Sequence, residues 1–451
     1  MALTNKQFRQ QIVGLARTGA PAEPRCPYAP PPGQCGGCAF QAVAYADQVR
    51  AKHAALRGLW APLLPAAAAE RIAFVASPDP YGYRTRMDYV ASKERFGLRR
   101  GGKFNYIVDL GECHLLPPAG FAAARAVYER AVALGLPDYN LRTHEGFLRY
   151  VVVRRSPDDE LLLAAITAAP DEAGARAAAM QALAETALAQ PGVAGFHWLV
   201  NDTRTDISFG REERHWGAAL LPMRVGARTL HIGPNTFFQN NVHLLLPLLD
   251  DVRAAVANDQ RPLLDNVRAA VANDQRPTTN DQQPAAVDEQ IVATTPASSF
   301  AVRRSSFVVA DLYGGAGTIA LHLADSAAHV TCVESVAESA QLATQNAAAN
   351  GCGNVEAVAA DVLAFLRAQP AGRYDVVVAD PPRTGLGPEV CQELLRLRPA
   401  RVVYVSCNPL TQVEDARALA EGYRLTRLTG YDMFPQTPHM ESLAVFERNE
   451  D

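Results

Sequence analysis

The sequence predicts an α/β protein whose C-terminal half folds as a doubly wound, mostly parallel sheet. Three observations predict this class: short apolar runs that each end in a polar residue, alanine-rich helical stretches between them, and a glycine-rich turn after the first run. The runs are Ser306 to Asp311, Ala328 to Glu334, Val355 to Asp361 and Tyr374 to Asp380. Ligands bind outside the carboxyl ends of the strands in such sheets, so the terminal carboxylates are expected to share one crevice.

The first run leads into the glycine-rich turn Asp311-Leu-Tyr-Gly-Gly-Ala-Gly-Thr318. Its glycines let the backbone turn sharply and approach a ligand closely. Such a turn alone is a weak signal, and the dinucleotide-binding and methyltransferase hypotheses start level. Glu334 ends the second run at the distance expected for a carboxylate that binds ribose hydroxyls. Asp380-Pro-Pro-Arg383 has no particular use in a dehydrogenase, which favours a methyltransferase.

A cysteine follows a fifth apolar run, in Val403-Tyr-Val-Ser-Cys-Asn-Pro409. A thiol at the mouth of the sheet suggests covalent catalysis, which methyl transfer to an unactivated pyrimidine carbon requires. A lone cysteine at a strand end is more often structural. The flanking residues of Cys407 and the downstream His439-Met-Glu441 reverse that preference.

Together these motifs resemble the RNA 5-methyluridine methyltransferases that use S-adenosylmethionine, which have the class I, Rossmann-like methyltransferase fold. The resemblance spans nearly the whole chain except an insertion near residues 250–300. It rests, in the family's order, on Phe237-Phe-Gln-Asn-Asn241, the glycine loop, Glu334, Asp361, Asp380-Pro-Pro-Arg383, Ser406-Cys-Asn-Pro409 and Pro438-His-Met-Glu441.

The resemblance implies a mechanism and a set of site residues. The thiolate of Cys407 would add to carbon 6 of a uracil, carbon 5 would take the methyl group, and Glu441 would remove the proton from carbon 5. A thiolate is needed, so we expect a lowered pKa for Cys407. The implied cofactor-binding residues are Gln239, Asp311, Tyr313, Gly315, Glu334, Asp361 and Asp380.

Simpler roles remain open for three of these residues. Glu441 alone would most often be a solvated carboxylate, and Asp361 could cap a following helix. Gln239 would usually be an ordinary polar residue in a turn.

The residue after the two prolines separates neighbouring reactions. RNA cytosine methyltransferases resemble this fold but place a second cysteine beside the prolines, and enzymes that methylate amino groups usually follow them with an aromatic residue. Arg383 occupies this place here, so uridine is favoured over cytosine or adenine.

Four cysteines in the N-terminal part form a candidate metal centre. Cys35-Gly-Gly-Cys38 can fold round one metal, with Cys26 before it and Cys113 far behind it. Spacing alone slightly favours zinc, the commoner structural metal. The family's cluster-bearing branch has this pattern with a distant fourth ligand, so the resemblance implies a 4Fe-4S centre on all four cysteines. Two disulfides are the remaining alternative, and they need an oxidising compartment.

We divide the chain into two predicted domains. Residues 1–228 are expected to form a β-rich α+β central domain with the iron-sulfur cysteines and RNA contacts, and residues 229–451 the methyltransferase domain. The family branch without an N-terminal RNA-binding barrel fits, because the residues before Cys26 are too few for one.

A duplication lies in the insertion near residues 250–300. Pro247 to Arg261 recurs as Pro262 to Arg276, and the copies differ only at Asp251 and Asn266. Two copies cannot form a solenoid, so we interpret them as lengthening a surface helix or loop. The polar stretch that follows is predicted to be flexible, and we assign the insertion no catalytic role.

Residues 84–103 are the predicted RNA footprint. The aromatic residues Tyr83, Tyr89, Phe96 and Phe104 interleave with its charges, a mixture suited to phosphate contact and base stacking. An ordinary solvated sheet face is an equal alternative. The basic residues are Arg84, Arg86, Lys93, Arg95, Arg99, Arg100 and Lys103.

Composition fits a soluble, cytoplasmic enzyme. A chain of 451 residues with 48% hydrophobic content can build two or more cores. The first residues lack an apolar core, so no secretory leader is expected, and no run approaches the roughly 20 apolar residues of a spanning helix. The net charge of −4 is not that of a generally basic nucleic-acid binder, although a local footprint does not require one. We expect a monomer with no membrane partner.

The resemblance implies a uridine in structured RNA as substrate. We favour 23S ribosomal RNA because the cluster-bearing bacterial relatives act mainly there, whereas archaeal relatives modify transfer RNA. Two alternatives come from other classes: a non-catalytic RNA-binding protein on this fold, and a redox sensor whose N-terminal cysteines switch a generic methyltransferase. Cys407, Glu441 and the cofactor motifs argue against the first, and no sequence feature tests the second.

Overall fold

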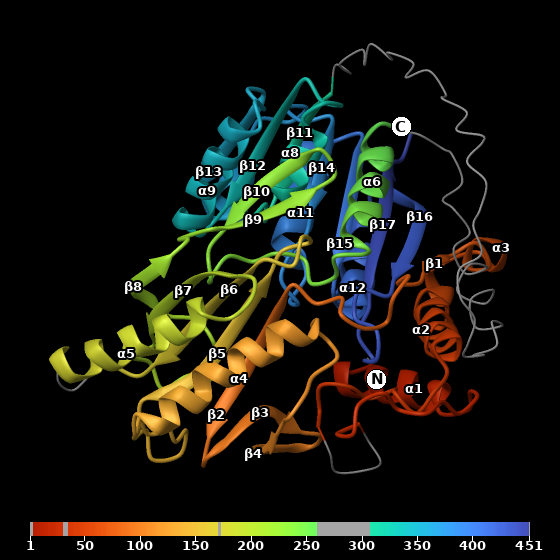
Figure 1. The fold of residues 1–451 in the computed structure, drawn as a ribbon. Coiled ribbons are helices and arrows are strands. Elements are labelled where there is room, and N and C mark those ends of the chain that lie inside the picture. The colour runs from red at the N-terminus through yellow and green to blue at the C-terminus, as the bar shows by residue number, and fades with distance from the viewer. Residues whose placement is uncertain (1–2, 30–34, 170–172, 259–306, 451) are drawn as a thin grey trace, which may run out of the picture.

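The computed structural model describes residues 3–29, 35–169, 173–258 and 307–450. These residues form two units around separate sheets, with the smaller unit at the lower left of Figure 1 and the larger one at the upper right. None of the described helices is long and apolar enough to cross a membrane.

The larger unit contains an eight-stranded sheet. From one edge to the other its strands are β1 (Ala73–Val75), β16 (Tyr423–Tyr431), β17 (Glu441–Arg448), β15 (Arg401–Ser406), β14 (Val376–Ala379), β11 (Val308–Leu312), β12 (His329–Glu334) and β13 (Val355–Ala359). The pairs from β15 to β13 are all parallel, whereas β17 is antiparallel to both of its neighbours. The predicted parallel sheet and its four strands are confirmed.

Helices cover both faces of this sheet. One face packs against α1 (Asn5–Ala16), α2 (Tyr45–Trp60), α10 (Val362–Arg367), α11 (Gly387–Leu397) and α12 (Pro409–Leu419). The other packs against α6 (Leu245–Val256), α8 (Thr318–Leu323), α9 (Ala337–Ala349) and the hairpin of β9 (Leu221–Val225) and β10 (Arg228–Ile232). Strands that are buried on both faces read as continuous apolar runs, which is why the sequence marks them so clearly.

The smaller unit is a seven-stranded, mostly antiparallel sheet. Its order is β4 (Lys103–Asp109), β3 (Arg95–Arg100), β2 (Arg86–Ser92), β5 (Leu148–Arg155), β6 (Leu161–Thr167), β7 (Val193–Val200) and β8 (Arg211–Gly217). The helices α4 (Pro118–Ala133) and α5 (Ala173–Leu188) pack against it (Figure 1). The short helices η1 (Ala61–Leu63) and α3 (Ala66–Ala69) follow α2.

The predicted domain division at residue 228 does not follow the packing. Strand β1 pairs with β16 in the larger sheet, and Phe8, Ile12 and Trp60 of the N-terminal helices are buried in the core of that unit. In Figure 1 the red α1 and α2 accordingly lie beside the blue C-terminal elements. The apolar faces of these helices pack against residues that are distant in the sequence. A division of the chain at a single residue cannot describe such packing.

The predicted start of the insertion is also wrong. Residues 250–256 belong to α6, in which Leu248, Val252 and Val256 are buried against the sheet. Asp251, where the two sequence copies differ, is buried and accepts a hydrogen bond from the hydroxyl of Tyr431. Residues 247–256 of the first copy therefore belong to the core of the larger unit. Residues 259–306, with the second copy and the stretch predicted to be flexible, lie outside the described residues.

Most aromatic residues of the predicted RNA footprint serve the core instead. Tyr83, Tyr89 and Phe96 are fully buried, whereas Phe104 is exposed and lies under the guanidinium of Arg99. The alternation of aromatic and basic residues reflects the two faces of strands β2 and β3, because successive side chains in a strand point to opposite sides. Base stacking by the three buried rings is therefore excluded.

Candidate active site

A pocket of about 490 Å³ opens at the carboxyl ends of β11 and β14. Four of the predicted cofactor-binding residues line it: Gln239, Tyr313, Gly315 and Asp380. The opposite wall is apolar and includes Leu248, Leu249 and Val252 of α6. The insertion near residues 250–300 was predicted to have no catalytic role, and that stays a prediction, although Val252 within this range lines the pocket.

The glycine loop between β11 and α8 has a conformation that few residues could adopt. Gly315 and Gly317 have positive φ angles of 55° and 88°, which glycine adopts without steric cost. Glu334 accepts a hydrogen bond from the amide of Gly315 at 3.0 Å, so the carboxylate at the end of β12 holds the loop. A Cβ atom on Gly314 would lie only 2.3 Å from Sγ of Cys332. The side chain of Cys332 therefore leaves no room for a Cβ atom at residue 314 unless one of the two residues shifts.

Two carboxyl groups lie at the strand ends, that of the buried Asp311 and that of the half-buried Asp380. Asp311 accepts a hydrogen bond from the amide of Ala320, and its second oxygen has no partner among the described residues. Burial raises the pKa of Asp311 to about 8, and the charges of Asp380 and Glu334 add to the shift. Asp380 accepts a hydrogen bond of 2.8 Å from the side-chain amide of Gln239, while burial raises its pKa to about 7.

Asp361 lies apart from these groups. Its carboxylate accepts a hydrogen bond of 2.9 Å from the amide of Ala364 and caps helix α10, which is the simpler role that the sequence left open. Its charge contributes to the raised pKa of Tyr313, so Asp361 is near the pocket that Tyr313 lines. A cofactor contact by Asp361 stays a prediction.

A second pocket of about 500 Å³ contains Cys407. Arg383, at the end of the Asp380-Pro-Pro-Arg383 turn, lines it together with His439 and with residues of the N-terminal helix α1. Because Asp380 lines the first pocket and Arg383 the second, one four-residue turn separates the two. The pocket is lined by Asn5, Phe8, Arg9, Arg383, Cys407, Asn408, Pro409, Pro438, His439 and Met440.

Strand register brings Cys407 and Glu441 together. Ser406, the last residue of β15, pairs with Ser442 of antiparallel β17. Cys407 directly follows this terminal pair and Glu441 directly precedes it, and the charge of Glu441 acts on the thiol of Cys407. Glu441 is 1% exposed, and one of its carboxyl oxygens has no hydrogen-bond partner among the described residues. Burial raises its pKa well above the ordinary value and the nearby Asp380 adds to the rise, whereas Arg383 lowers it.

The expected lowering of the Cys407 pKa is not found. Burial raises the pKa of this thiol to about 12, and the charge of Glu441 adds to the rise. The guanidinium of Arg383 acts in the opposite direction, by its charge and by a hydrogen bond. The thiol is therefore protonated in the free protein, because a desolvated thiolate beside a carboxylate is costly.

His439 and Arg9 are pocket residues that the sequence analysis did not single out. Burial, together with the charges of Arg383, Arg9, Lys52 and Arg84, lowers the pKa of His439 to about 3, so its imidazole is neutral. His439 stands in the quoted Pro438-to-Glu441 motif and could have been found there. No sequence signal connects Arg9 to residues almost 400 positions away.

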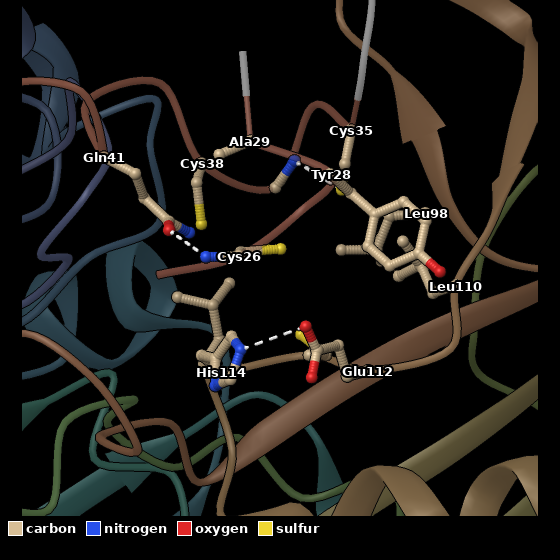
Figure 2. Close-up of a pocket in the computed structure, with 13 residues that line it drawn as sticks. Cys26, Tyr28, Ala29, Cys35, Cys38, Gln41, Leu98, Leu110, Glu112 and His114 are labelled. Carbon is tan, nitrogen blue, oxygen red and sulfur yellow. Dashed lines mark hydrogen bonds and ion pairs between the residues drawn. The ribbon is translucent and has the colours of Figure 1, made fainter. Parts of the chain in front are cut away.

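The four predicted metal ligands also converge. Cys26, Cys35, Cys38 and Cys113 line one cavity of about 300 Å³, and Figure 2 shows the first three around it. All eight cysteines of the chain are free, so the two disulfides of the alternative are not present. The amide of Gly37 donates a hydrogen bond to Sγ of Cys35 at 3.4 Å.

The spread of the sulfurs bears on the kind of metal centre. Within the described part of the chain, only His197, Glu212 and His215 bring three ligand atoms within 4.8 Å of one another. No three cysteine sulfurs meet that limit, whereas four thiolates around one zinc ion lie about 3.8 Å apart. A four-iron cluster takes one thiolate at each iron and therefore holds the sulfurs farther apart than a single zinc ion does.

A doubly wound parallel sheet, a glycine loop closed by a carboxylate, and adjacent pockets at the strand ends define a class I S-adenosylmethionine-dependent methyltransferase fold. The sequence profile of the tRNA (uracil-5-)-methyltransferase family matches residues 282–449.

Relatives match over almost the whole chain. An uncharacterized RNA methyltransferase of Nitratidesulfovibrio vulgaris is 29% identical over 100% of this chain and 88% of its own length. A tRNA (uracil(54)-C(5))-methyltransferase of Pyrococcus horikoshii is 27% identical over 91% of this chain and 83% of its own. The crystal structure of the Pyrococcus abyssi tRNA (uracil-54, C5)-methyltransferase in complex with S-adenosyl-L-homocysteine superposes with a TM-score of 0.68. It is 25% identical and covers 93% of this chain and 86% of its own.

This chain is similar to the S-adenosylmethionine-dependent RNA 5-methyluridine methyltransferases, and the family profile and the relatives above support that family. It is an RNA (uracil-5-)-methyltransferase that uses S-adenosylmethionine.

Proposed function

We propose that this enzyme methylates carbon 5 of a specific uridine through a covalent adduct on Cys407, with Glu441 as the base. The observation that carries the proposal is the terminal Ser406–Ser442 pair of β15 and β17, next to which Cys407 and Glu441 lie, beside the turn between the two pockets. A nucleophile and a base on the same face of the target ring are what this substitution needs.

Each step has a residue in place. Sγ of Cys407 adds to carbon 6 of the uracil, and the electron pair of the carbon 5–carbon 6 double bond becomes available at carbon 5. Carbon 5 then takes the methyl group, which S-adenosylmethionine supplies from its sulfonium when bound. Glu441 removes the proton from carbon 5, and the carbon 6–sulfur bond breaks to release Cys407.

The protonated state of Cys407 in the free protein is compatible with these reaction steps. The thiol must lose its proton before it adds, and Arg383 is the group that favours the thiolate. Glu441 must be ionised to act as the base, although its burial beside Asp380 raises its pKa. Both groups react in their deprotonated forms, so the rate is expected to increase with pH.

The cofactor-binding residues are proposed from the first pocket. Gln239, Tyr313, Gly315 and Asp380 line this pocket. We assign a cofactor contact to the carboxylate of Asp380, which accepts a hydrogen bond from Gln239. We assign Glu334 to the ribose hydroxyls and Asp311 to support of the glycine loop from below. Asp361, as the N-cap of α10, is the most peripheral member of the set.

We propose that Cys26, Cys35, Cys38 and Cys113 hold a 4Fe-4S cluster. The support is the convergence of four free thiols, their wide spacing and the amide donor to Cys35. Such a centre would cross-link the segment before β1 to the segment after β4. An absorption spectrum and iron content of anaerobically purified protein distinguish it from zinc.

We propose 23S ribosomal RNA as the substrate, because the four N-terminal cysteines resemble those of the family's cluster-bearing bacterial branch. The same reaction on transfer RNA is the alternative, and the names of the Pyrococcus relatives support it. A non-catalytic protein on this fold would bind RNA without transferring a methyl group.

One experiment tests the chemistry and the substrate together. The protein is incubated with S-adenosylmethionine and with ribosomal or transfer RNA transcripts that contain 5-fluorouridine, and any protein–RNA adduct is located by mass spectrometry. Fluorine cannot leave as a proton, so the adduct on Cys407 should persist and carry one added methyl group. Cys407→Ala should form no adduct, whereas Cys391→Ala, which alters a buried thiol outside both pockets, should still form it. An adduct on another residue, or methylation of ordinary uridine by Cys407→Ala, would contradict the mechanism.

A further inference from the structure

The N-terminal helix α1 forms one wall of the pocket that contains Cys407. Asn5, Phe8 and Arg9 line this pocket together with Arg383 and His439. The helix is separated from Cys407 by almost the whole sequence and lies beside the C-terminal elements in Figure 1. The entrance to the reactive thiol is therefore shared between the methyltransferase sheet and the beginning of the chain.

The helix is held firmly in this place. Phe8, Ile12 and Ala16 recur on one face and are buried in the core of the larger unit. Thr4 and Gln7 close the start of the helix with reciprocal hydrogen bonds, a capping box that satisfies free backbone amides. A buried face and a closed end fix the direction of the remaining face, which points to the pocket and to solvent.

No ion pair among the described residues accounts for the charge of Arg9. Its Nε donates a hydrogen bond to the carbonyl of Asn5 in its own helix, and among the described residues no carboxylate lies within ion-pair distance of it. Arg9 is exposed, yet close enough to the half-buried ring of His439 to contribute to the lowered pKa of that imidazole. A guanidinium with no carboxylate partner among the described residues therefore lies at the rim of the pocket, which the guanidinium of Arg383 also lines.

We propose that α1 is part of the RNA-binding surface and that Arg9 binds a backbone phosphate at or next to the target uridine. The proposal rests on the proposed function, because it takes the Cys407 pocket as the place of the flipped base. A phosphate is joined to its base through one ribose, so a base against Cys407 keeps its phosphates at the rim. A guanidinium there can bind phosphate oxygens with two parallel hydrogen bonds.

The chain offers a matched control on the same helix. Arg17 caps the other end of α1, is exposed and does not line the pocket. Arg9→Ala and Arg17→Ala thus remove the same charge from one helix, and only the first removes it from the pocket. Arg9→Lys keeps the charge but loses the paired hydrogen bonds.

Filter binding of 23S ribosomal RNA and of transfer RNA transcripts, measured from low to high salt, tests the proposal. For the RNA that binds, Arg9→Ala should raise Kd roughly three- to tenfold at moderate salt. The slope of log K against log salt should fall in magnitude by about 0.7 to 0.9, the value for one lost phosphate contact. Arg17→Ala should leave the slope unchanged, and Arg9→Lys should keep most of it.

Kinetics separates this role from a structural one. Arg9→Ala should raise KM for RNA with little change in kcat and in Tm, because a rim contact is made equally before and during reaction. Equal Kd values and salt slopes for Arg9→Ala and Arg17→Ala would overturn the proposal, as would a loss of Tm that accounts for the weaker binding. Failure of the proposed function is seen separately, as a wild-type protein that binds RNA but forms no 5-methyluridine.

Discussion

Replacement of Arg383 by glutamine should slow every reaction of the Cys407 thiol. Arg383 is the group that stabilises the thiolate, against burial and the charge of Glu441. An opposite charge within hydrogen-bonding reach shifts a pKa by about 1 to 3 units, and the exposure of Arg383 to solvent places this case at the lower end. Loss of one unit corresponds to about a tenfold smaller thiolate fraction at any pH below the pKa.

Alkylation of Cys407 by iodoacetamide, followed for its own peptide by mass spectrometry between pH 7 and 10, measures this fraction. The pKa of about 12 lies above the whole range, so the logarithm of the wild-type rate should rise in proportion to pH without a plateau. Arg383→Gln should give a parallel line about tenfold lower, and Arg383→Lys should lie between the two. The backbone carbonyl of Arg383 is held by the side-chain amide of Asn408 at 2.8 Å, so the turn should survive these changes.

Two results would refute the reasoning. A wild-type plateau that begins below pH 9 would mean that the thiolate is already stable in the free protein. Equal rates for wild type and Arg383→Gln would mean that the guanidinium does not act on Cys407. The 5-fluorouridine adduct should follow the same order of rates as alkylation, since both reactions use the thiolate.

Three further predictions concern two residues of the site and one buried ion pair. Glu441→Gln should reduce 5-methyluridine formation by about 10²- to 10⁴-fold, and a covalent adduct with RNA that contains only ordinary uridine should accumulate and be visible on a denaturing gel. A normal turnover rate for this variant would show that Glu441 is not the base. Gly314→Ala should weaken the binding of S-adenosylhomocysteine, measured by calorimetry, because the added Cβ atom would collide with the sulfur of Cys332. The double variant Gly314→Ala, Cys332→Ala should bind S-adenosylhomocysteine as tightly as wild type, and no recovery would mean that this collision is not the cause. Lys52→Met should cost about 3 to 5 kcal/mol in urea unfolding, because it leaves buried Asp432 unpaired, and a cost below 1 kcal/mol would contradict this.

The fold of the larger unit was easier to predict from the sequence than that of the N-terminal part. Its central strands are buried on both faces and therefore appear as apolar runs, and the glycine loop has a local conformational cause at Gly315 and Gly317. The N-terminal part was harder to predict. Tyr83, Tyr89 and Phe96 suggested a stacking surface, but the sequence does not show which face of a strand is covered.

The protonation states of the site residues could not be predicted from the sequence either. The chemistry calls for a reactive Cys407, and the sequence supplied no reason to doubt a lowered pKa. Burial and the approach of Glu441 from an antiparallel strand reverse that expectation. A pKa depends on solvent and on neighbours in space, so it cannot be inferred from a motif alone.

The sequence by itself determined which chemical groups this protein has and the order in which they occur: the glycine loop, the strand-end carboxylates, Cys407, Glu441 and the four N-terminal cysteines. These features are local, because strand propensity, glycine turns and reactive side chains depend on a few neighbouring residues. Only the tertiary structure decided that α1 stands over the Cys407 pocket and that α6 walls the cofactor pocket. Those placements follow from the burial of apolar faces against distant parts of the chain, and such burial is a property of the folded protein as a whole.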